Sequence, residues 1–210
     1  RCKLAFFNGE GLWTNLPDAL RRELFIRWMP TLRENADIFL SEDVEPALPL
    51  VSPPLYINRF KKGEQSIYTI YNAGLRTQFA KIRLHLPRNG HIFDLLNLKE
   101  IPIRKDGKDA LIDLAVNPHD ILCLLIAPRK LSVKLEGDKI NVKISESEAR
   151  ELWVARIDEE GARRDIGKFP LRGKEMTFEL RKLFPNLKGH LLFRLPLTHS
   201  SEDITAIEVR

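Results

Sequence analysis

The stretch AKIRLHL, residues 80–86, alternates strictly between apolar and polar side chains. Successive side chains of a β-strand point to opposite faces, so its isoleucine and two leucines would share one face and its charged residues the other. Such alternation is typical of a strand that is buried on one face and solvated on the other. This segment therefore predicts an antiparallel sheet that packs one face into a core.

Similar short runs surround this strand on both sides. They are LYINRF, SIYTIYN, HIFDLL, ALIDLAV and DILCLLIA, and they fall between residues 55 and 127. Turn signals separate them, at residues 62–64, 72–74, 88–90, 105–107 and 117–118. Short strands at such spacing predict an antiparallel β-sandwich over residues 51–129.

The C-terminal part, residues 130–210, repeats this pattern with further candidate strands. These are LSVKLEG, KINVKIS, ELWVARID, RDIGKFPL, EMTFEL, HLLFRLPL and DITAIEV. Gly137-Asp138 predicts a hairpin turn, and FELRKLFPNLKG is compatible with one helical turn. We expect a second sandwich here, of the immunoglobulin-like kind.

The N-terminal part, residues 1–50, has a different sequence pattern from the two β regions. The run KLAFF, residues 3–7, predicts a short buried strand. The segment TNLPDALRRELFIRWM, residues 14–29, has an apolar residue every four positions and predicts a helix that Pro30 ends or kinks. A second helical piece is expected at 31–39, followed by a proline-rich linker or crossing strap at 41–54. The predicted fold class is thus mainly β, with two antiparallel sandwiches after a short strand–helix segment.

Composition narrows the classes of function. The net charge of +5 is spread over strands and turns, so no nucleic-acid partner is expected, and no apolar run is long enough to predict a membrane span. Cys123 lies within an apolar run and is interpreted as a buried thiol. The chain does not begin with Met, so it could be a fragment, and its localisation stays open.

One stretch suggests chemistry, the segment NGEGLW at residues 8–13. An acid between two glycines, after a strand and before a helix, is the local pattern of a (β/α)8 barrel, where functional side chains follow the strands. In this hypothesis Glu10 is catalytic, and Asn8 and Trp13 bind substrate, with the tryptophan offering a flat surface to a sugar ring. The alternative is that the segment is a solvated turn and Trp13 packs on the helix.

Other candidate groups have ordinary structural explanations. The histidines lack metal-ligand spacing, so neither a metal nor a cofactor is expected. Asp94 with Asp113 and Asp106 with Asp109 are possible carboxylate pairs, but a turn explains the second pair and Asp113 is expected to point outward on its strand. The aromatic residues Tyr56, Tyr68, Tyr71 and Trp153 could form a carbohydrate platform, but core packing explains them better.

The order of these segments resembles the end of a barrel glycoside hydrolase, of the α-amylase and α-galactosidase-like kind, running into its C-terminal β domains. The resemblance covers residues 1–128 and rests on LAFFNGEGLW, the run Asn58-Arg59-Phe60, the strand SIYTIYN, the pair Phe93-Asp94 with the Asp106-Gly107 turn, and the segment from Pro118 to Leu124. It implies that residues 1–40 are the last βα unit of the barrel, with Glu10 and Asn8 at its C-terminal face, and that residues 51–210 are non-catalytic.

We therefore expect a C-terminal accessory region of a multidomain carbohydrate-active protein. Its partners would be the rest of the parent polypeptide and, through the catalytic barrel, carbohydrate. The isolated chain shows one candidate acid, so it is not expected to hydrolyse glycosides by itself. The rival hypotheses are a stand-alone carbohydrate-binding module, an immunoglobulin-like protein-interaction module, and a small complete enzyme in which a second acid folds close to Glu10.

Overall fold

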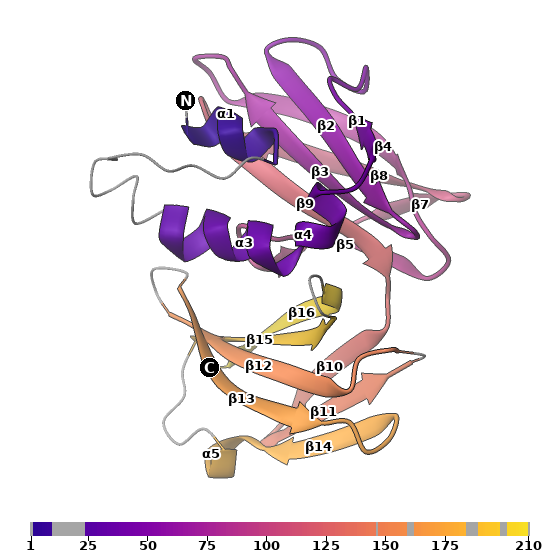
Figure 1. Ribbon diagram of the computed structural model, residues 1–210, viewed down its shortest axis with the longest axis vertical. Coiled ribbons are helices and arrows are strands. Elements are labelled where there is room, and N and C mark those ends of the chain that lie inside the picture. The colour runs from indigo at the N-terminus through magenta and orange to yellow at the C-terminus, as the bar shows by residue number, and fades with distance from the viewer. Residues whose placement is uncertain are drawn as a thin grey trace. The chain divides into compact units, whose positions relative to one another are not determined.

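The computed structural model describes residues 2–9, 24–145, 147–158, 162–183, 189–197 and 201–209. It is mainly β, with antiparallel sheets, which confirms the predicted fold class (Figure 1). The chain divides into two compact units, residues 1–128 and residues 129–210. Within the described ranges, no helix is both long and apolar enough to cross a membrane.

The first unit contains a large antiparallel sheet with strand order β1-β2-β3-β9-β5-β6. Its strands are β1 (Asp43–Glu45), β2 (Leu55–Lys62), β3 (Gln65–Asn72), β9 (Ile121–Pro128), β5 (Gly90–Asp94) and β6 (Lys99–Glu100). β9 is the last of these strands in the sequence, yet it lies between β3 and β5 in the sheet.

A smaller sheet with order β4-β8-β7 covers one face of the large sheet. It consists of β4 (Gln78–His85), β8 (Asp109–Val116) and β7 (Arg104–Asp106). The predicted alternation of β4 is confirmed, because Ile82 and Leu84 are buried while Lys81 and Arg83 are exposed. The shared core takes side chains from both sheets, namely Leu55, Ile57, Tyr68, Ile70, Ile82, Leu84, Ile92, Ile112, Leu114, Leu124 and Ile126.

The N-terminal helices cover the other face of the large sheet. They are α1 (Cys2–Phe7), α3 (Met29–Glu34) and α4 (Ala36–Phe39), and α1 and α4 contact β2 or β3 (Figure 1). The predicted strand at residues 3–7 is therefore wrong, because these residues form α1. A five-residue apolar run satisfies a helix and a strand equally well, and here the helix buries Phe6 and Phe7.

Two polar side chains of the sheet hold the end of α1. The Phe7 carbonyl oxygen accepts hydrogen bonds from Thr69 Oγ1 at 2.6 Å and from Asn58 Nδ2 at 3.2 Å. Thr69 and Asn58 are buried register partners on β3 and β2, so α1 ends over the centre of this strand pair. The last carbonyl groups of a helix have no hydrogen-bond donor within the helix, and these two side chains supply donors for the Phe7 carbonyl.

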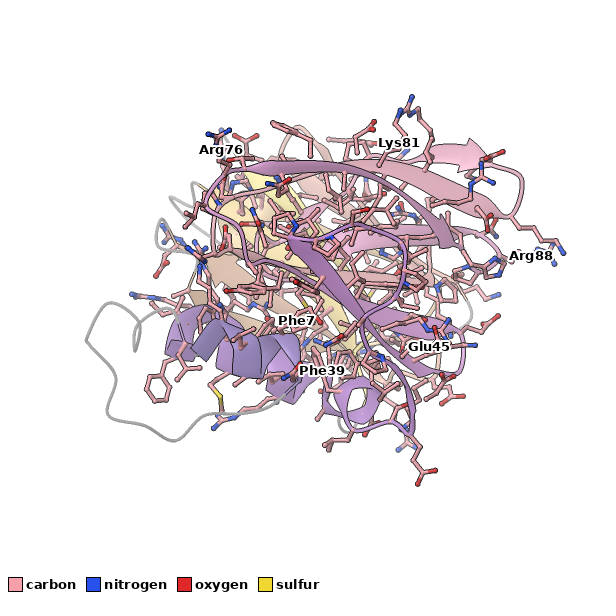
Figure 2. The ribbon with its side chains drawn as sticks, turned by 90° about the horizontal axis from the view of Figure 1, so that it is seen from above. Phe7, Phe39, Glu45, Arg76, Lys81 and Arg88 are labelled. Carbon is pink, nitrogen blue, oxygen red and sulfur yellow. The ribbon has the colours of Figure 1, made fainter. Side chains whose placement is uncertain are left out.

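Aromatic side chains also attach the N-terminal helices to the large sheet. Phe39 of α4 stacks edge-on against Phe60 of β2, with ring centroids 5.1 Å apart, and Phe7 lies 6.0 Å from Tyr71. Figure 2 shows Phe7 and Phe39 inside the molecule, whereas Arg76 and Lys81 extend outward. The N-terminal helices are thus part of the hydrophobic structure of the first unit.

The helical segment runs through Pro30 instead of stopping there. A π-helical turn, Leu24–Trp28, passes directly into α3, whose first turn contains Pro30. Proline lacks an amide hydrogen, and it is tolerated where a first turn leaves that donor unused. The expected second helical piece at 31–39 is confirmed as the remainder of α3 and α4, with a break at Asn35.

The proline-rich segment at 41–54 behaves as a crossing strap. It forms edge strand β1 on β2, and Leu48 and Val51 pack against the core of the first unit. The Ala47 amide donates to Asn58 Oδ1 at 3.0 Å, and the peptide bond between Pro53 and Pro54 is cis. Part of this segment therefore belongs to the edge of the large sheet and to the core of the first unit.

The second unit is also built from two facing sheets. One has order β10-β11-β14, from β10 (Leu131–Glu136), β11 (Lys139–Ile144) and β14 (Glu175–Glu179). The other has order β13-β12-β15-β16, from β13 (Arg163–Pro170), β12 (Glu151–Ile157), β15 (Gly189–Pro196) and β16 (Ser201–Val209). The helical turn α5 (Leu180–Leu183) and the hairpin turn at Gly137-Asp138 confirm the predictions.

Candidate functional site

The structure describes one of the three predicted site residues. Glu10 and Trp13 lie outside the described residues. Asn8 is exposed in the turn after α1, where its Oδ1 accepts a hydrogen bond from Asn58 Nδ2 at 3.3 Å. Residues 3–7 form a helix, so the prediction that a strand precedes Glu10, as in the last βα unit of a barrel, is wrong. The roles of Asn8, Glu10 and Trp13 stay predictions.

The four aromatic candidates lie in different environments. Tyr68 is buried in the core of the first unit, and burial raises the pKa of its hydroxyl, an effect that nearby Arg59 opposes. Tyr71 packs against Phe7, while Tyr56 is 40% exposed. Trp153 belongs to the second unit. Core packing therefore accounts for Tyr68 and Tyr71.

Trp153 lies between two cations on the neighbouring strands of its sheet. Lys168 Nζ lies 4.0 Å and the Arg194 guanidinium carbon 4.6 Å from the centre of the indole ring. Its Nε1 donates to Glu151 at 3.0 Å. Two cation–π contacts occupy the ring, so it is not offered as an open surface for a sugar.

The carboxylates of the first unit lie in separate structural environments. Asp94 is buried and accepts hydrogen bonds from the Leu96 amide and from the amide and side chain of Asn97. Burial raises the pKa of Asp94, and these hydrogen bonds oppose that rise. Asp113, in contrast, is exposed and pairs with Arg104 at 2.6 Å. The two do not face each other across a cleft, as glycoside hydrolysis by a carboxyl pair requires.

Buried carboxylates of the second unit also have structural roles. Asp203 accepts hydrogen bonds from the Lys130 and Leu131 amides, both at 2.6 Å, at the start of β10. Its neighbour Glu202 accepts from Lys130 Nζ, from Ser147 Oγ and from the Glu148 amide. We call Glu202 and Asp203 the carboxylate clamp, because they tie the start of β16 to β10 and to the 147–149 loop.

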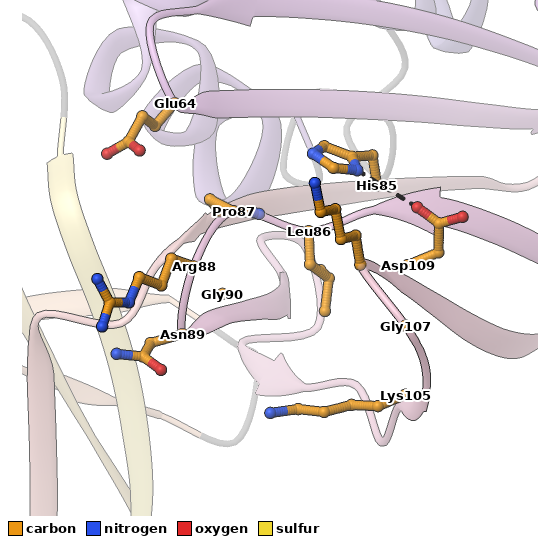
Figure 3. A pocket seen from close by; sticks show the side chains of 11 residues that line it. Glu64, His85, Leu86, Pro87, Arg88, Asn89, Gly90, Lys105, Gly107 and Asp109 are labelled. Atoms are coloured by element: carbon orange, nitrogen blue, oxygen red, sulfur yellow. Dashed lines mark hydrogen bonds and ion pairs between the residues drawn. The ribbon is translucent and has the colours of Figure 1, made fainter.

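A pocket of about 480 Å³ opens in the first unit where three turns come together (Figure 3). The turns are the β2–β3 hairpin, the β4–β5 connection and the β7–β8 hairpin. The lining residues are Glu64, His85, Leu86, Pro87, Arg88, Asn89, Gly90, Lys105, Gly107, Lys108 and Asp109. This is the candidate functional site that the described residues define.

Backbone hydrogen bonds shape this pocket. The Leu86 amide donates to the Lys108 carbonyl at 3.1 Å and so ties two of the turns together. The Gly90 amide donates to the Pro87 carbonyl at 2.8 Å, which closes the 87–90 turn. A Cβ at Gly90 would come within 2.7 Å of the Pro87 ring, so this turn requires glycine at that position.

The charges of the pocket are unevenly paired. His85 Nδ1 lies 3.3 Å from Asp109 Oδ1 across the β4–β8 pair. In the part of the chain that the structure describes, Arg88, Lys105 and Lys108 have no carboxylate within ion-pair distance. In Figure 3 the Arg88 side chain lies beside Asn89 and the Lys105 side chain lies below Leu86, with their charged ends apart. The lining thus presents three cations that no carboxylate of the described residues pairs.

The sequence indicated these turns but not the site. The three turn signals KGE, RNG and KDG belong to the lining segments, and each pairs a glycine with a basic residue. That the three turns lie at the same end of the sandwich follows only from the pairing of the strands. Among the described residues, no group of three or more His, Cys, Asp and Glu side chains is arranged to hold a metal ion.

Comparison with known proteins gives only distant matches. No protein-family model matches the chain, and no curated protein matches it. The similar solved structures include two glycoside hydrolases. A rhamnosidase from Novosphingobium sp. PP1Y is 12% identical with a TM-score of 0.30, over 75% of this chain and 15% of that protein.

The second is a β-1,2-glucanase from Parabacteroides distasonis, which is 9% identical with a TM-score of 0.25. That match covers 79% of this chain and 36% of the glucanase. The chain therefore spans much less than two thirds of either enzyme. Both TM-scores are below 0.5, and neither match assigns a function to this chain.

Proposed function

We propose that this chain is a non-catalytic accessory region of a multidomain, glycoside hydrolase-like carbohydrate-active protein. In this proposal, residues 51–129 and 130–210 act as β-sandwich domains that stabilise a catalytic domain elsewhere in the parent polypeptide. The resemblance of residues 51–128 to the β domains that follow such a barrel supports this assignment. Contact with carbohydrate would come mainly through the catalytic domain of the parent.

The observation that carries the proposal is the use of the buried carboxylates. Asp94, Glu202 and Asp203 accept hydrogen bonds from backbone amides, so their oxygens are occupied within the fold. A glycosidase needs one carboxyl group that donates a proton and a second that faces it across the scissile bond. Carboxylates that hold turns and strand ends in place are suited to a supporting role instead.

Two measurements test the proposal together. The first is the sequence of the gene upstream of the codon for Arg1, where we expect an in-frame catalytic domain. The second is hydrolysis of a panel of p-nitrophenyl glycosides by the purified chain, where we expect no release of p-nitrophenol. A start codon directly before Arg1 would overturn the proposal. So would hydrolysis by the wild-type chain that disappears in Glu10→Gln.

A further inference from the structure

The pocket between the three turns has the size of a small-molecule site. Its volume of about 480 Å³ falls in the range of about 300–1,000 Å³ that is typical of ligand pockets. Leu86 and Pro87 contribute apolar surface to its lining, while Asn89 contributes an amide that can both donate and accept hydrogen bonds. This combination suits a ligand with an apolar C–H face and hydroxyl groups, as in a pyranose ring.

The charged residues of the lining indicate which of these ligands would fit the pocket. Arg88, Lys105 and Lys108 are exposed cations, and they come from two different turns of the pocket. Asp109 is already paired with His85, which leaves Glu64 as the acidic group opposite them. The lining therefore has a small positive excess, which matches a ligand that carries a single carboxylate.

The same charges argue against two other classes of ligand. Nucleic-acid binding depends on neutralising many phosphate charges at once, and the small positive excess of this lining does not supply that. Neutral sugars are commonly bound on the flat face of a Trp, Tyr or Phe ring, but none of these three side chains lines this pocket in the described part of the chain. Recognition would therefore depend on the cations.

We propose that this pocket binds a uronic acid residue of an acidic oligosaccharide. The inference deepens the proposed function, on which it rests, because it gives the accessory region a carbohydrate contact of its own. The cations of Arg88 and Lys105 attract the sugar carboxylate from different parts of the lining. Asn89 and Glu64 contact the hydroxyl groups, and the surface of Leu86 and Pro87 packs against the ring.

The test is isothermal titration calorimetry of the full chain with digalacturonic acid and with the neutral disaccharide cellobiose. We expect measurable binding of the acidic sugar and at least about tenfold weaker binding of the neutral one, because charge-assisted hydrogen bonds are the strong contacts here. Arg88→Gln and Lys105→Gln should each weaken binding of digalacturonic acid by about tenfold.

Arg76→Gln is the matched control, because Arg76 is an exposed loop arginine of the same unit that does not line the pocket (Figure 2). It should leave the affinity unchanged. Circular dichroism melting checks that each variant folds as the wild type does, which is expected for exposed side chains.

Several outcomes would overturn the inference. They are equal affinity for the acidic and neutral sugars, equal losses in Arg76→Gln and Arg88→Gln, or inorganic phosphate binding as tightly as the sugar. The last would mean that the pocket recognises charge alone. Failure of the proposed function would be separate, because it would show in the upstream gene sequence while the binding data stayed intact.

Discussion

Replacing Glu202 by Gln tests whether the carboxylate clamp holds the second unit together. The Glu202 side chain is 7% exposed and pairs with Lys130, which is 28% exposed. It also accepts hydrogen bonds from Ser147 Oγ and the Glu148 amide. Gln keeps the shape and one acceptor oxygen, but it removes the charge and places a donor where the fold provides only donors.

The expected loss can be estimated from these contacts. Removing one partner of a fully buried ion pair costs about 3–5 kcal/mol. Lys130 is partly exposed and regains some hydration in the variant, so we expect a loss of about 2 kcal/mol in the free energy of unfolding. For a unit of this size, that corresponds to a fall of roughly 8–16 °C in the Tm of the second unit.

The effect should depend on pH in a defined direction. Burial acts to raise the pKa of Glu202, but the hydrogen bonds from Lys130, Ser147 and the Glu148 amide outweigh it and lower the pKa below its ordinary value of 4.5. The stability from this group is therefore present above pH 4.5 and is lost as the pH falls through the folded pKa. The difference between wild type and variant should be largest near pH 7.

Differential scanning calorimetry of both proteins from pH 7 to pH 3 measures this difference. Lys143→Gln is a suitable control, because Lys143 and Glu175 form an exposed ion pair with side chains 68% and 70% accessible. That variant should unfold almost as the wild type does. Equal Tm values for wild type and Glu202→Gln at pH 7, or a difference that does not change with pH, would refute the reasoning.

Two further predictions concern the attachment of the N-terminal helices. Gly9→Ala should destabilise the first unit by about 1–3 kcal/mol in urea unfolding. Gly9 has φ +75° and an added Cβ would lie 3.1 Å from the Phe39 ring, whereas the control Gly63→Ala has φ +59° but open space around it. Equal losses in both would show that crowding against Phe39 contributes nothing. Thr69→Val should cost about 1–2 kcal/mol, since it removes the buried bond to the Phe7 carbonyl. Thr77→Val removes only an exposed bond, and a comparable loss there would contradict the prediction.

The sequence predicted the strands best where one face of a strand is solvated. The run at residues 80–86 alternates because β4 has one exposed face, and its structure follows the pattern. The prediction that Cys123 is buried is also confirmed, since it is inaccessible in β9. The strand predicted at residues 3–7 failed because the segment is short and its apolar side chains fit either period, so tertiary contacts with β2 and β3 decide its conformation.

The candidate pocket could not be predicted from local patterns. Each of its turns was recognisable from a glycine and its polar neighbours, but their meeting depends on strand pairing over long sequence distances. The pairing of β4 with β8, for example, brings His85 beside Asp109, which is 24 positions away in the sequence. Local sequence propensity determines each turn, whereas strand register and sheet topology determine which turns line the same pocket.

The central position of β9 has a consequence for synthesis of the protein on the ribosome. The chain emerges N-terminus first, so β3 and β5 leave the exit tunnel before the strand that pairs with both of them. Until residue 128 has emerged, each of these strands keeps an open edge that can pair with another nascent chain. The last strand of the first unit ends at the boundary with the second, so this exposure persists while the ribosome is already translating the C-terminal unit.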